Sequence, residues 1–288
     1  MTADWRRDEA RREEAALVDA TVPNAARVAD YLDGGKDNFE ADRKAARSLV
    51  AAAPIIGLIA PAWRAFHQRA VRYLVREAGV RQFIYVGVSL AASNDTNEIV
   101  WSADPRCRIV FADNDPLVLA HARALMRPVP DRGAGSPHGA TGYVDADVSE
   151  PGAIVAGARE TLDFGQPVAV MLMFILAFIE DTATAAGIVS SLAGALPPGS
   201  HVVIHHIASE LNPALEMAAR RWNQMSEQQI TLRSKDEVAS LVAGLELVSP
   251  GLVPIGEWRH GRHDPHFEEV IPMHAVVARK PIAQRGPR

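Results

Sequence analysis

A turn of small residues follows the first strongly apolar run of the chain, 83–86. Gly87, Val88 and Ser89 make up this turn, and a backbone of this kind can approach a ligand closely. The glycines that a dinucleotide-binding loop would have two and five positions after Gly87 are replaced by Ser89 and Ala92. The loop therefore predicts a ligand contact through its backbone, but it lacks the full pyrophosphate-binding pattern.

Acidic residues follow the next two apolar runs. Asp113, with Asn114 beside it, is suited to accept hydrogen bonds from a ribose diol, and Asp145 or Asp147 is suited to meet an adenine amino group. An apolar wall, 174–178, follows the fourth run. Acidic strand ends without a phosphate-binding lysine favour a nucleoside cofactor that has no pyrophosphate, such as S-adenosylmethionine, over NAD.

The same carboxylates have a second interpretation as helix caps. Asp115 is followed by Pro116, the order typical of an N-cap and the first helical residue. Asp113 would then serve the same cap, and Asp147 would cap the following helix. Both interpretations stand at the level of the sequence.

Two adjacent histidines, His205 and His206, end the fifth apolar run. Either imidazole is suited to act as a general base near neutral pH, and the strand-end position predicts that His206 faces the ligand site. The alternative is a histidine that packs at the sheet and bonds to backbone groups.

Three more histidines, His260, His263 and His266, recur at every third position of a polar segment. A metal site and a solvated loop are the two interpretations. The loop is favoured, and no metal is predicted, because the prolines and glycines there leave no helix to align the ligands.

Aromatic residues of the N-terminal part suggest a lid for a flat substrate, with Tyr31, Trp63 and Phe66 as its members. Core packing explains the same residues equally well.

The elements that would position these residues change in character near residue 80. Residues 1–80 show helical spacing throughout and predict a helical cap region, whereas 81–288 alternates short β-branched runs with amphipathic stretches. The predicted strands are 82–88, 108–112, 141–146, 167–175 and 200–208, with a helix after each, then a helix at 236–244 and strands at 245–253 and 270–279. Five strand–helix units in succession predict a doubly wound, mostly parallel α/β sheet covered on both faces.

The overall composition narrows the classes of partner. The chain of 288 residues has a net charge of -5, which disfavours a nucleic-acid partner, and its longest apolar run, 168–179, is too short to span a membrane. A single cysteine, Cys107, suits the cytoplasm. The charge run at 4–14 predicts either a solvated helix or an arm that joins two chains as a homodimer.

Six stretches together point to one family: PNAARVADYLDGGKDNFEADR (23–43), WRAFHQRAVRYL (63–74), RQFIYVGVSL (81–90), FADNDPLVLAHARAL (111–125), GSHVVIHH (199–206) and GLELVSPGLVPIGEW (244–258). They resemble the S-adenosylmethionine-dependent methyltransferase family common in actinobacteria, once catalogued as a domain of unknown function. The resemblance covers residues 22–281 and implies a class I methyltransferase (Rossmann-like) fold whose N-terminal helices close over the pocket.

The resemblance also implies roles for individual residues. The cap segment with Lys36, Asp37 and Asn38 would close over the cofactor, Gly87 would lie beside its amino-acid portion with Ser89 in the same loop, Asp113 and Asn114 would lie near its ribose, and Asp147 near its adenine. The substrate would meet the aromatic residues Tyr31, Trp63, Phe66, Tyr85, Phe174 and Phe178. His206 matches a family position, and His205 replaces a usual serine.

The chain departs from the family in the cofactor loop, where DIGTGLPTQGNTHE becomes YVGVSLAASNDTNE. Tyr85 replaces a carboxylate expected to orient the methionine amine, an interaction worth about 1.5–3 kcal/mol. Ser89 replaces a glycine, and Ala177 replaces a histidine after the fourth strand. These changes predict weak or lost cofactor binding.

Three functions are consistent with these features. The first is S-adenosylmethionine-dependent methyl transfer to a small molecule in specialised metabolism, with His206 or His205 removing a proton. The second is a related enzyme that has lost methyl transfer and catalyses a cyclisation or isomerisation in the same pocket. The third is a non-catalytic binding protein.

Overall fold

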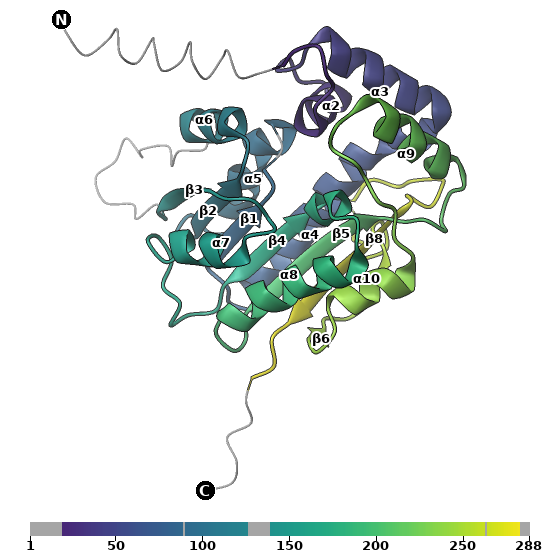
Figure 1. The fold of residues 1–288 in the computed structure, drawn as a ribbon. Helices are drawn as coiled ribbons and strands as arrows, with labels where there is room; N and C mark the ends of the chain where they lie inside the picture. Colours follow the sequence, from purple (N-terminus) through teal and green to yellow (C-terminus); the bar gives the residue numbers. More distant parts are fainter. Residues whose placement is uncertain (1–18, 89, 126–138, 263, 283–288) are drawn as a thin grey trace, which may run out of the picture.

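The computed structural model describes residues 19–88, 90–125, 139–262 and 264–282 (Figure 1). The charge run at 4–14, Ser89, His263 and most of a Pro/Gly-rich stretch at 128–140 lie outside the described residues.

A central sheet organises the molecule, and within the described residues it has eight strands. The strands are β1 (Gln82–Val86), β2 (Arg108–Asp113), β3 (Thr141–Asp145), β4 (Ala169–Met173), β5 (His201–Ile207), β6 (Glu246–Leu247), β7 (Val253–Pro254) and β8 (Met273–Arg279). Their order is β3-β2-β1-β4-β5-β8-β6, with β7 also paired to β8. Strands β1 to β5 are parallel, and β8 runs antiparallel beside β5.

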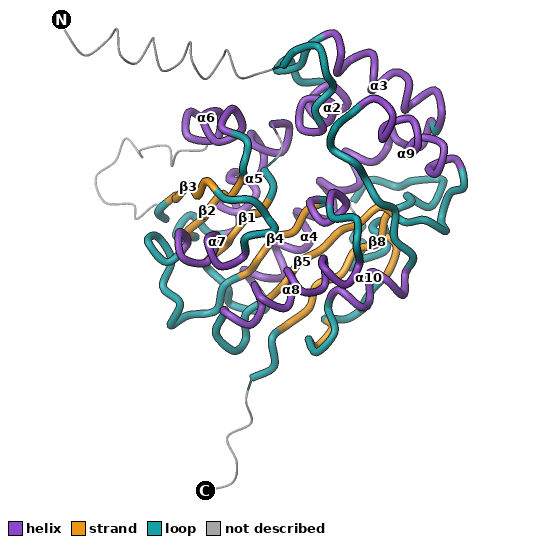
Figure 2. Tube along the Cα trace, viewed as in Figure 1, coloured by secondary structure: helices purple, strands orange, loops and turns teal. Residues whose placement is uncertain are grey.

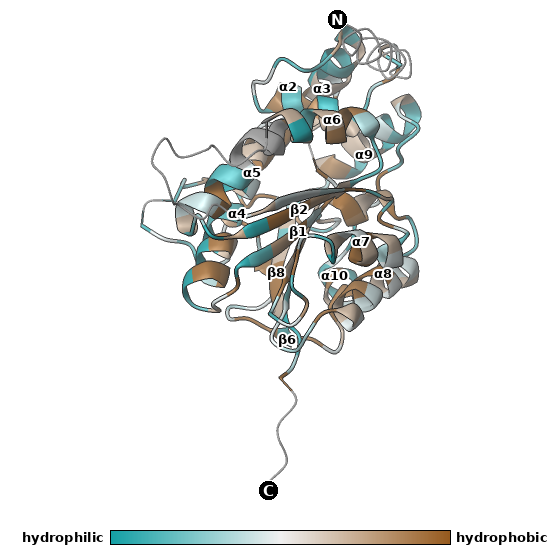
Figure 3. Cartoon of the chain, turned by 90° about the vertical axis from the view of Figure 1, so that its left-hand side faces the viewer, coloured by the Kyte–Doolittle hydropathy of each residue, from teal (hydrophilic) through white to brown (hydrophobic). Residues whose placement is uncertain are grey.

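Helices cover both faces of this sheet, and Figure 3 shows the sheet edge-on between them. Helices α4 (Ile59–Arg76), α5 (Leu90–Ala103) and α6 (Pro116–Leu125) pack on one face, and α7 (Pro151–Ala158), α8 (Thr182–Ala195) and α10 (Lys235–Leu241) pack on the other. Because both faces are covered, the strands read as continuous apolar runs; all five residues of β1 are buried. The predicted parallel α/β sheet is confirmed.

Two predicted segments differ in detail. The strand predicted at 245–253 is divided into β6 and β7, because Pro250 has no N–H to offer a ladder and Gly251 takes a φ of 90°. The strand predicted at 167–175 ends at Met173, and the apolar wall at 174–178 contains a short 3-10 helix, η2 (Ile175–Phe178).

Three helices lie together at the upper right of Figure 2. They are α2 (Ala25–Leu32), α3 (Glu40–Ala52) and α9 (Ala214–Met225), and we call them the cap. A 3-10 turn, η1 (Pro54–Leu58), connects α3 to α4. Helix α4 belongs to the predicted cap region of 1–80, yet its apolar side packs on the sheet.

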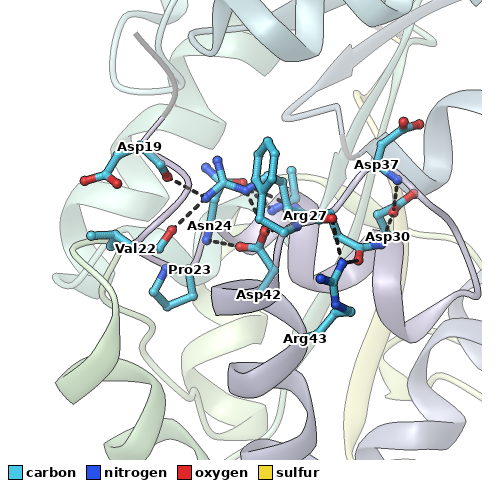
Figure 4. A network of polar contacts seen from close by, with 12 residues as sticks. Asp19, Val22, Pro23, Asn24, Arg27, Asp30, Asp37, Asp42 and Arg43 are labelled. Carbon is cyan, nitrogen blue, oxygen red and sulfur yellow. Dashed lines mark hydrogen bonds and ion pairs between the residues drawn. The ribbon is translucent and has the colours of Figure 1, made fainter. Parts of the chain in front are cut away.

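A buried ion pair holds the start of the cap together (Figure 4). The Nε of Arg27 donates to Oδ2 of Asp42 at 2.8 Å, and its Nη2 donates to the carbonyls of Asp19 and Val22 at 3.0 and 2.6 Å. The other oxygen of Asp42 accepts the Asn24 N–H at 3.0 Å. Both oxygens of Asp42 and two of the three guanidinium nitrogens of Arg27 therefore have partners, which offsets the cost of burying two charges.

Within the described residues, no single helix is long and apolar enough to cross a membrane. Helix α3 and the segment Pro54–Arg76 together have the length and apolar composition of a membrane span, but a bend of 115° lies between them.

Candidate functional site

The order of the sheet places a topological switch point between β1 and β4, the position where doubly wound sheets bind ligands. Gly87 follows β1 there with a φ of +76°, and a Cβ on it would come within 2.6 Å of the Ile175 side chain. A side chain is therefore excluded at Gly87 by both its backbone conformation and its neighbour.

The residue that follows β4 is strained. Phe174 has a φ of 71°, which is uncommon for a residue with a Cβ, and its N–H donates to the His205 carbonyl at 3.2 Å. Backbone strain of this kind costs on the order of 1–3 kcal/mol and clusters at functional sites. Gly87 and Phe174 thus mark the two sides of the switch point.

Asp113 connects the ends of β1 and β2. Its Oδ2 accepts the Val88 N–H at 2.6 Å, and its Oδ1 accepts the Asp115 N–H at 2.9 Å. Burial raises the pKa of the Asp113 carboxyl to about 6 despite these hydrogen bonds. A carboxylate has about four acceptor positions, so the group can still accept hydrogen bonds from a ligand.

Asp115 is the helix N-cap residue that its sequence context predicts, because its Oδ1 accepts the N–H groups of Leu117 and Val118 at 2.8 and 3.4 Å. Asn114 instead donates from Nδ2 to Oδ2 of Asp147 at 2.6 Å.

Asp147 does not cap α7. Its Oδ1 accepts the N–H and hydroxyl of Ser149, and Glu150 is the N-cap residue. The hydrogen bond from Asn114 to Asp147 therefore links the segments that follow β2 and β3.

The loop between α2 and α3 contacts both α4 and α6. Asp33 pairs with Arg64 of α4, and Asp37 lies 3.9 Å from Nδ1 of His121. Asn38 uses its amide inside this loop, donating to Asp30 at 2.7 Å and accepting from Arg43 at 3.1 Å.

Asn38 therefore braces the cap in this structure, and Lys36 is exposed on the same loop. The printed contacts of the Asn38 side chain are with Asp30, Gly35 and Arg43, all within α2, α3 and the loop between them.

The structure corrects the hypothesis that His206 faces the ligand site. Successive strand residues point to opposite faces, and His206 lies on the face of α8 with both ring nitrogens engaged. Its Nδ1 lies 2.9 Å from the Ile207 carbonyl, and its Nε2 lies 2.7 Å from Nη1 of the buried Arg233. Burial lowers the pKa of His206 to about 4, so a neutral ring accepts from Arg233 and has no lone pair left for a substrate.

His205 lies on the opposite face, towards α4. Its ring centroid is 6.4 Å from Trp63, 6.3 Å from Phe66 and 6.4 Å from Phe174. Burial lowers the pKa of His205 to about 3. Its Nδ1 is buried and has no hydrogen-bond partner among the described residues.

The aromatic residues divide by their burial. Phe66 is fully buried and stacks edge-on against Trp258 at 5.5 Å, which makes it a core residue. Trp63, Phe174, Phe178 and Tyr31 are partly exposed, and Phe178 packs edge-on against Phe174 at 5.7 Å.

Tyr85 does not project into open space. Its hydroxyl lies 2.6 Å from Nε2 of His67, and both side chains are buried. Burial raises the pKa of Tyr85 well above its usual value and lowers that of His67 to about 3, so the pair is neutral.

Sequence reasoning missed His67. It follows Trp63 by four residues in a helix, the spacing that places two side chains on one helix face, and that signal would have found it.

Among the described residues, no group of three histidine, cysteine or acidic side chains is arranged to hold a metal ion. His260 and His266 are exposed, and His263 is not described.

Comparisons with known proteins bear on the whole chain. The model of the S-adenosyl methyltransferase family matches residues 11–281. A crystal structure of a DUF574-family protein from Streptomyces avermitilis is 35% identical, covers 91% of this chain and 99% of its own, and superposes with a TM-score of 0.82. A candidate methyltransferase from Thermobifida fusca is 32% identical, with coverages of 91% and 96% and a TM-score of 0.79.

No curated protein matches the chain. The family match nevertheless spans nearly the whole sequence, and the sheet has five parallel strands followed by an antiparallel strand next to the fifth. The chain therefore belongs to the S-adenosyl methyltransferase family and has the class I methyltransferase fold.

Proposed function

We propose that this protein is a methyltransferase that binds S-adenosylmethionine at the β1–β4 switch point and methylates a small molecule. The observation that carries the proposal is the buried carboxylate of Asp113 at the end of β2. It holds the loop after β1 in place and retains acceptor positions for a ribose diol.

The residues fit the two halves of the cofactor unequally. Asp113 and the linked pair of Asn114 and Asp147 suit the nucleoside half, which offers hydroxyl and amino donors. The methionine half would meet Gly87 but no carboxylate at position 85, where the phenol of Tyr85 is bonded to His67. We therefore expect binding that is weaker than a charged contact to the amine would give, by about 1.5–3 kcal/mol.

When bound, this cofactor supplies an electrophilic methyl group on a sulfonium. The protein then has to hold the acceptor in line with it and exclude water, which are effects of alignment. Trp63, Phe174 and Phe178 offer an apolar wall for this purpose. His205 is the imidazole available to accept a hydrogen bond from the acceptor, since His206 is committed to Arg233. We infer a place in specialised metabolism, in the cytoplasm, for such a reaction.

A second candidate function rests on Tyr85. A neutral phenol–imidazole pair at this position suits a member of the family that has lost methyl transfer and uses the pocket for a cyclisation or isomerisation. A non-catalytic binding protein would use the same surface.

Calorimetric titration with S-adenosylmethionine and S-adenosylhomocysteine tests the proposal. We expect micromolar binding that Asp113→Asn weakens at least about tenfold, a loss of about 1.4 kcal/mol. Asp115→Asn is the matched control, since asparagine also caps helices and should leave the affinity unchanged. No binding of either compound at millimolar concentration would rule out methyl transfer and favour the second candidate.

A further inference from the structure

A cluster of aromatic and imidazole rings joins α4 to the ends of β1, β4 and β5. We call it the α4–β5 cluster, and its members are Trp63, Phe66, His67, Tyr85, Phe174 and His205. The Trp63 ring stacks on both imidazoles, at 6.1 Å from His67 and 6.4 Å from His205, with interplanar angles of 29° and 28°. Four of these rings are buried, and Trp63 and Phe174 are partly exposed.

Two polar atoms in this cluster lack partners. The Nδ1 of His67 and the Nδ1 of His205 are both buried without a hydrogen bond to any described residue. Leaving such a group unpaired costs about 1–3 kcal/mol, so buried polar atoms are nearly always satisfied. His205 is only 3% exposed and borders Trp63 and Phe174, which are partly exposed. Its unpaired nitrogen points to a ligand that enters along these two rings.

The cluster carries no net charge. Both imidazoles are neutral because burial lowers the pKa of each to about 3, and Tyr85 is a neutral phenol. Arg64, which follows Trp63 in the sequence, is paired with Asp33. The acidic side chains Asp113 and Asp147 lie at the end of β2 and just after β3 instead. An anionic substrate would lose its hydration here without gaining a counterion.

The imidazole of His205 indicates which polar group a ligand should carry. A hydroxyl both donates and accepts, so it satisfies Nδ1 of His205 in either tautomer. Aromatic rings prefer to stack on other flat rings at offset or edge-on geometry.

We propose that the α4–β5 cluster binds the acceptor substrate, and that this substrate is a neutral planar aromatic molecule whose hydroxyl group bonds to His205. This inference deepens the proposed function. The role of the bound molecule as methyl acceptor rests on that function, whereas its binding to the cluster can be tested separately.

The test uses the full-length protein and calorimetric titration with 2-naphthol and 7-hydroxycoumarin as neutral probes and 2-naphthoate as an anionic one. We expect the neutral probes to bind at least about tenfold more tightly than 2-naphthoate, consistent with the cost of an unpaired charge. His205→Phe keeps a flat ring but removes the nitrogen, and should weaken both neutral probes about fivefold, the value of one hydrogen bond.

His201→Phe is the matched control. His201 lies four residues earlier on β5, on the same face, and is 2% exposed, but it packs against Tyr73 at the far end of the strand. Its replacement should leave the affinity for both neutral probes unchanged. Thermal melting checks that each variant is folded. If His205→Phe is not folded, His205→Leu replaces it, with at least the same expected loss because leucine has no hydrogen-bonding group.

The outcomes separate the two proposals. If S-adenosylmethionine binds but neither neutral probe does up to its solubility limit, the inference about the substrate is overturned and the proposed function stands. Equal binding of 2-naphthoate, or equal binding to His205→Phe, also overturns the inference. If the neutral probes bind through His205 but S-adenosylmethionine does not, the cluster is confirmed as a binding site and methyl transfer is ruled out.

Discussion

The N–H of Val88 donates to Oδ2 of Asp113 at 2.6 Å, so the last residue of β2 holds the loop that follows β1. The second oxygen of Asp113 holds the loop that follows β2, through the Asp115 N–H at 2.9 Å. One carboxylate thus shapes both loops at the switch point before any ligand arrives.

Replacing Asp113 should therefore cost stability as well as affinity. In Asp113→Asn, one of the two N–H groups faces an amide NH2 instead of an oxygen, and we expect the free energy of unfolding to fall by about 1–3 kcal/mol. Urea unfolding measures this change. In Asp115→Asn the free energy of unfolding should fall by only a few tenths of a kcal/mol, since the asparagine keeps a capping oxygen. Equal losses in the two variants would show that Asp113 has no special role in holding the loops.

Cofactor binding should depend on pH through the same group. Burial raises the pKa of Asp113 to about 6, so the carboxylate is charged above that pH and protonated below it. We expect the affinity for S-adenosylhomocysteine to be constant above about pH 7 and to weaken as the pH falls through 6, because a protonated acid loses acceptor capacity. Titrations across this range in Asp113→Asn should show a flatter dependence. An affinity that rises on acidification would contradict the assigned contact.

Four of the five histidines that are buried among the described residues should make the protein less stable in mild acid. Burial lowers the pKa of His67 and His205 to about 3 and that of His201 and His206 to about 4, whereas an unfolded histidine titrates near 6.5. The unfolded chain binds more protons below that pH, so each histidine removes about 1.4 kcal/mol of stability per pH unit until its folded pKa is reached.

Asp113 acts in the opposite direction, since a raised carboxyl pKa favours the folded state as the pH falls through 6. One such group does not outweigh four histidines. Urea unfolding at several pH values measures the net slope, and His201→Phe should reduce it. An unchanged slope in that variant would show that His201 is not buried in its neutral form.

The pair of Tyr85 and His67 should be coupled. Tyr85→Phe leaves both nitrogens of His67 without a partner, and we expect a loss of about 1–3 kcal/mol. In a cycle with His67→Leu, the double variant should lose less than the sum of the single variants. Strict additivity in urea unfolding would mean that the 2.6 Å contact contributes nothing.

The cap should depend on its buried ion pair. Asp42 is fully buried, and Arg27→Met would leave its charge unpaired at a cost of about 3–5 kcal/mol. Hydrogen exchange should accelerate in α2 and α3. Arg47→Met is the control, because its pair with Glu40 is exposed by 53% and 70% and is worth at most about 1 kcal/mol. Similar exchange in both variants would contradict a role for the buried pair.

The sequence was sufficient for the sheet and for the strand-end acids. Parallel strands covered on both faces are continuous apolar runs, so five of them could be placed from hydropathy alone. The positions of Gly87 and Asp113 follow, because each comes directly after such a run. The interpretation of Asp115 as a helix N-cap was also within reach, since it depends only on the three residues that follow it, of which Leu117 and Val118 donate their N–H groups.

The partners of the histidines depended on the tertiary structure. The period of a strand requires His205 and His206 to face opposite ways, but it does not say which helix layer covers which face. That assignment comes from α4 packing against His205 and from Arg233 reaching His206, contacts between residues far apart in the chain. The pairing of Tyr85 with His67 likewise requires α4 to lie across β1. Local sequence determines where strands begin and end, whereas the chemistry of a buried side chain is determined by which distant groups desolvate it and bond to it.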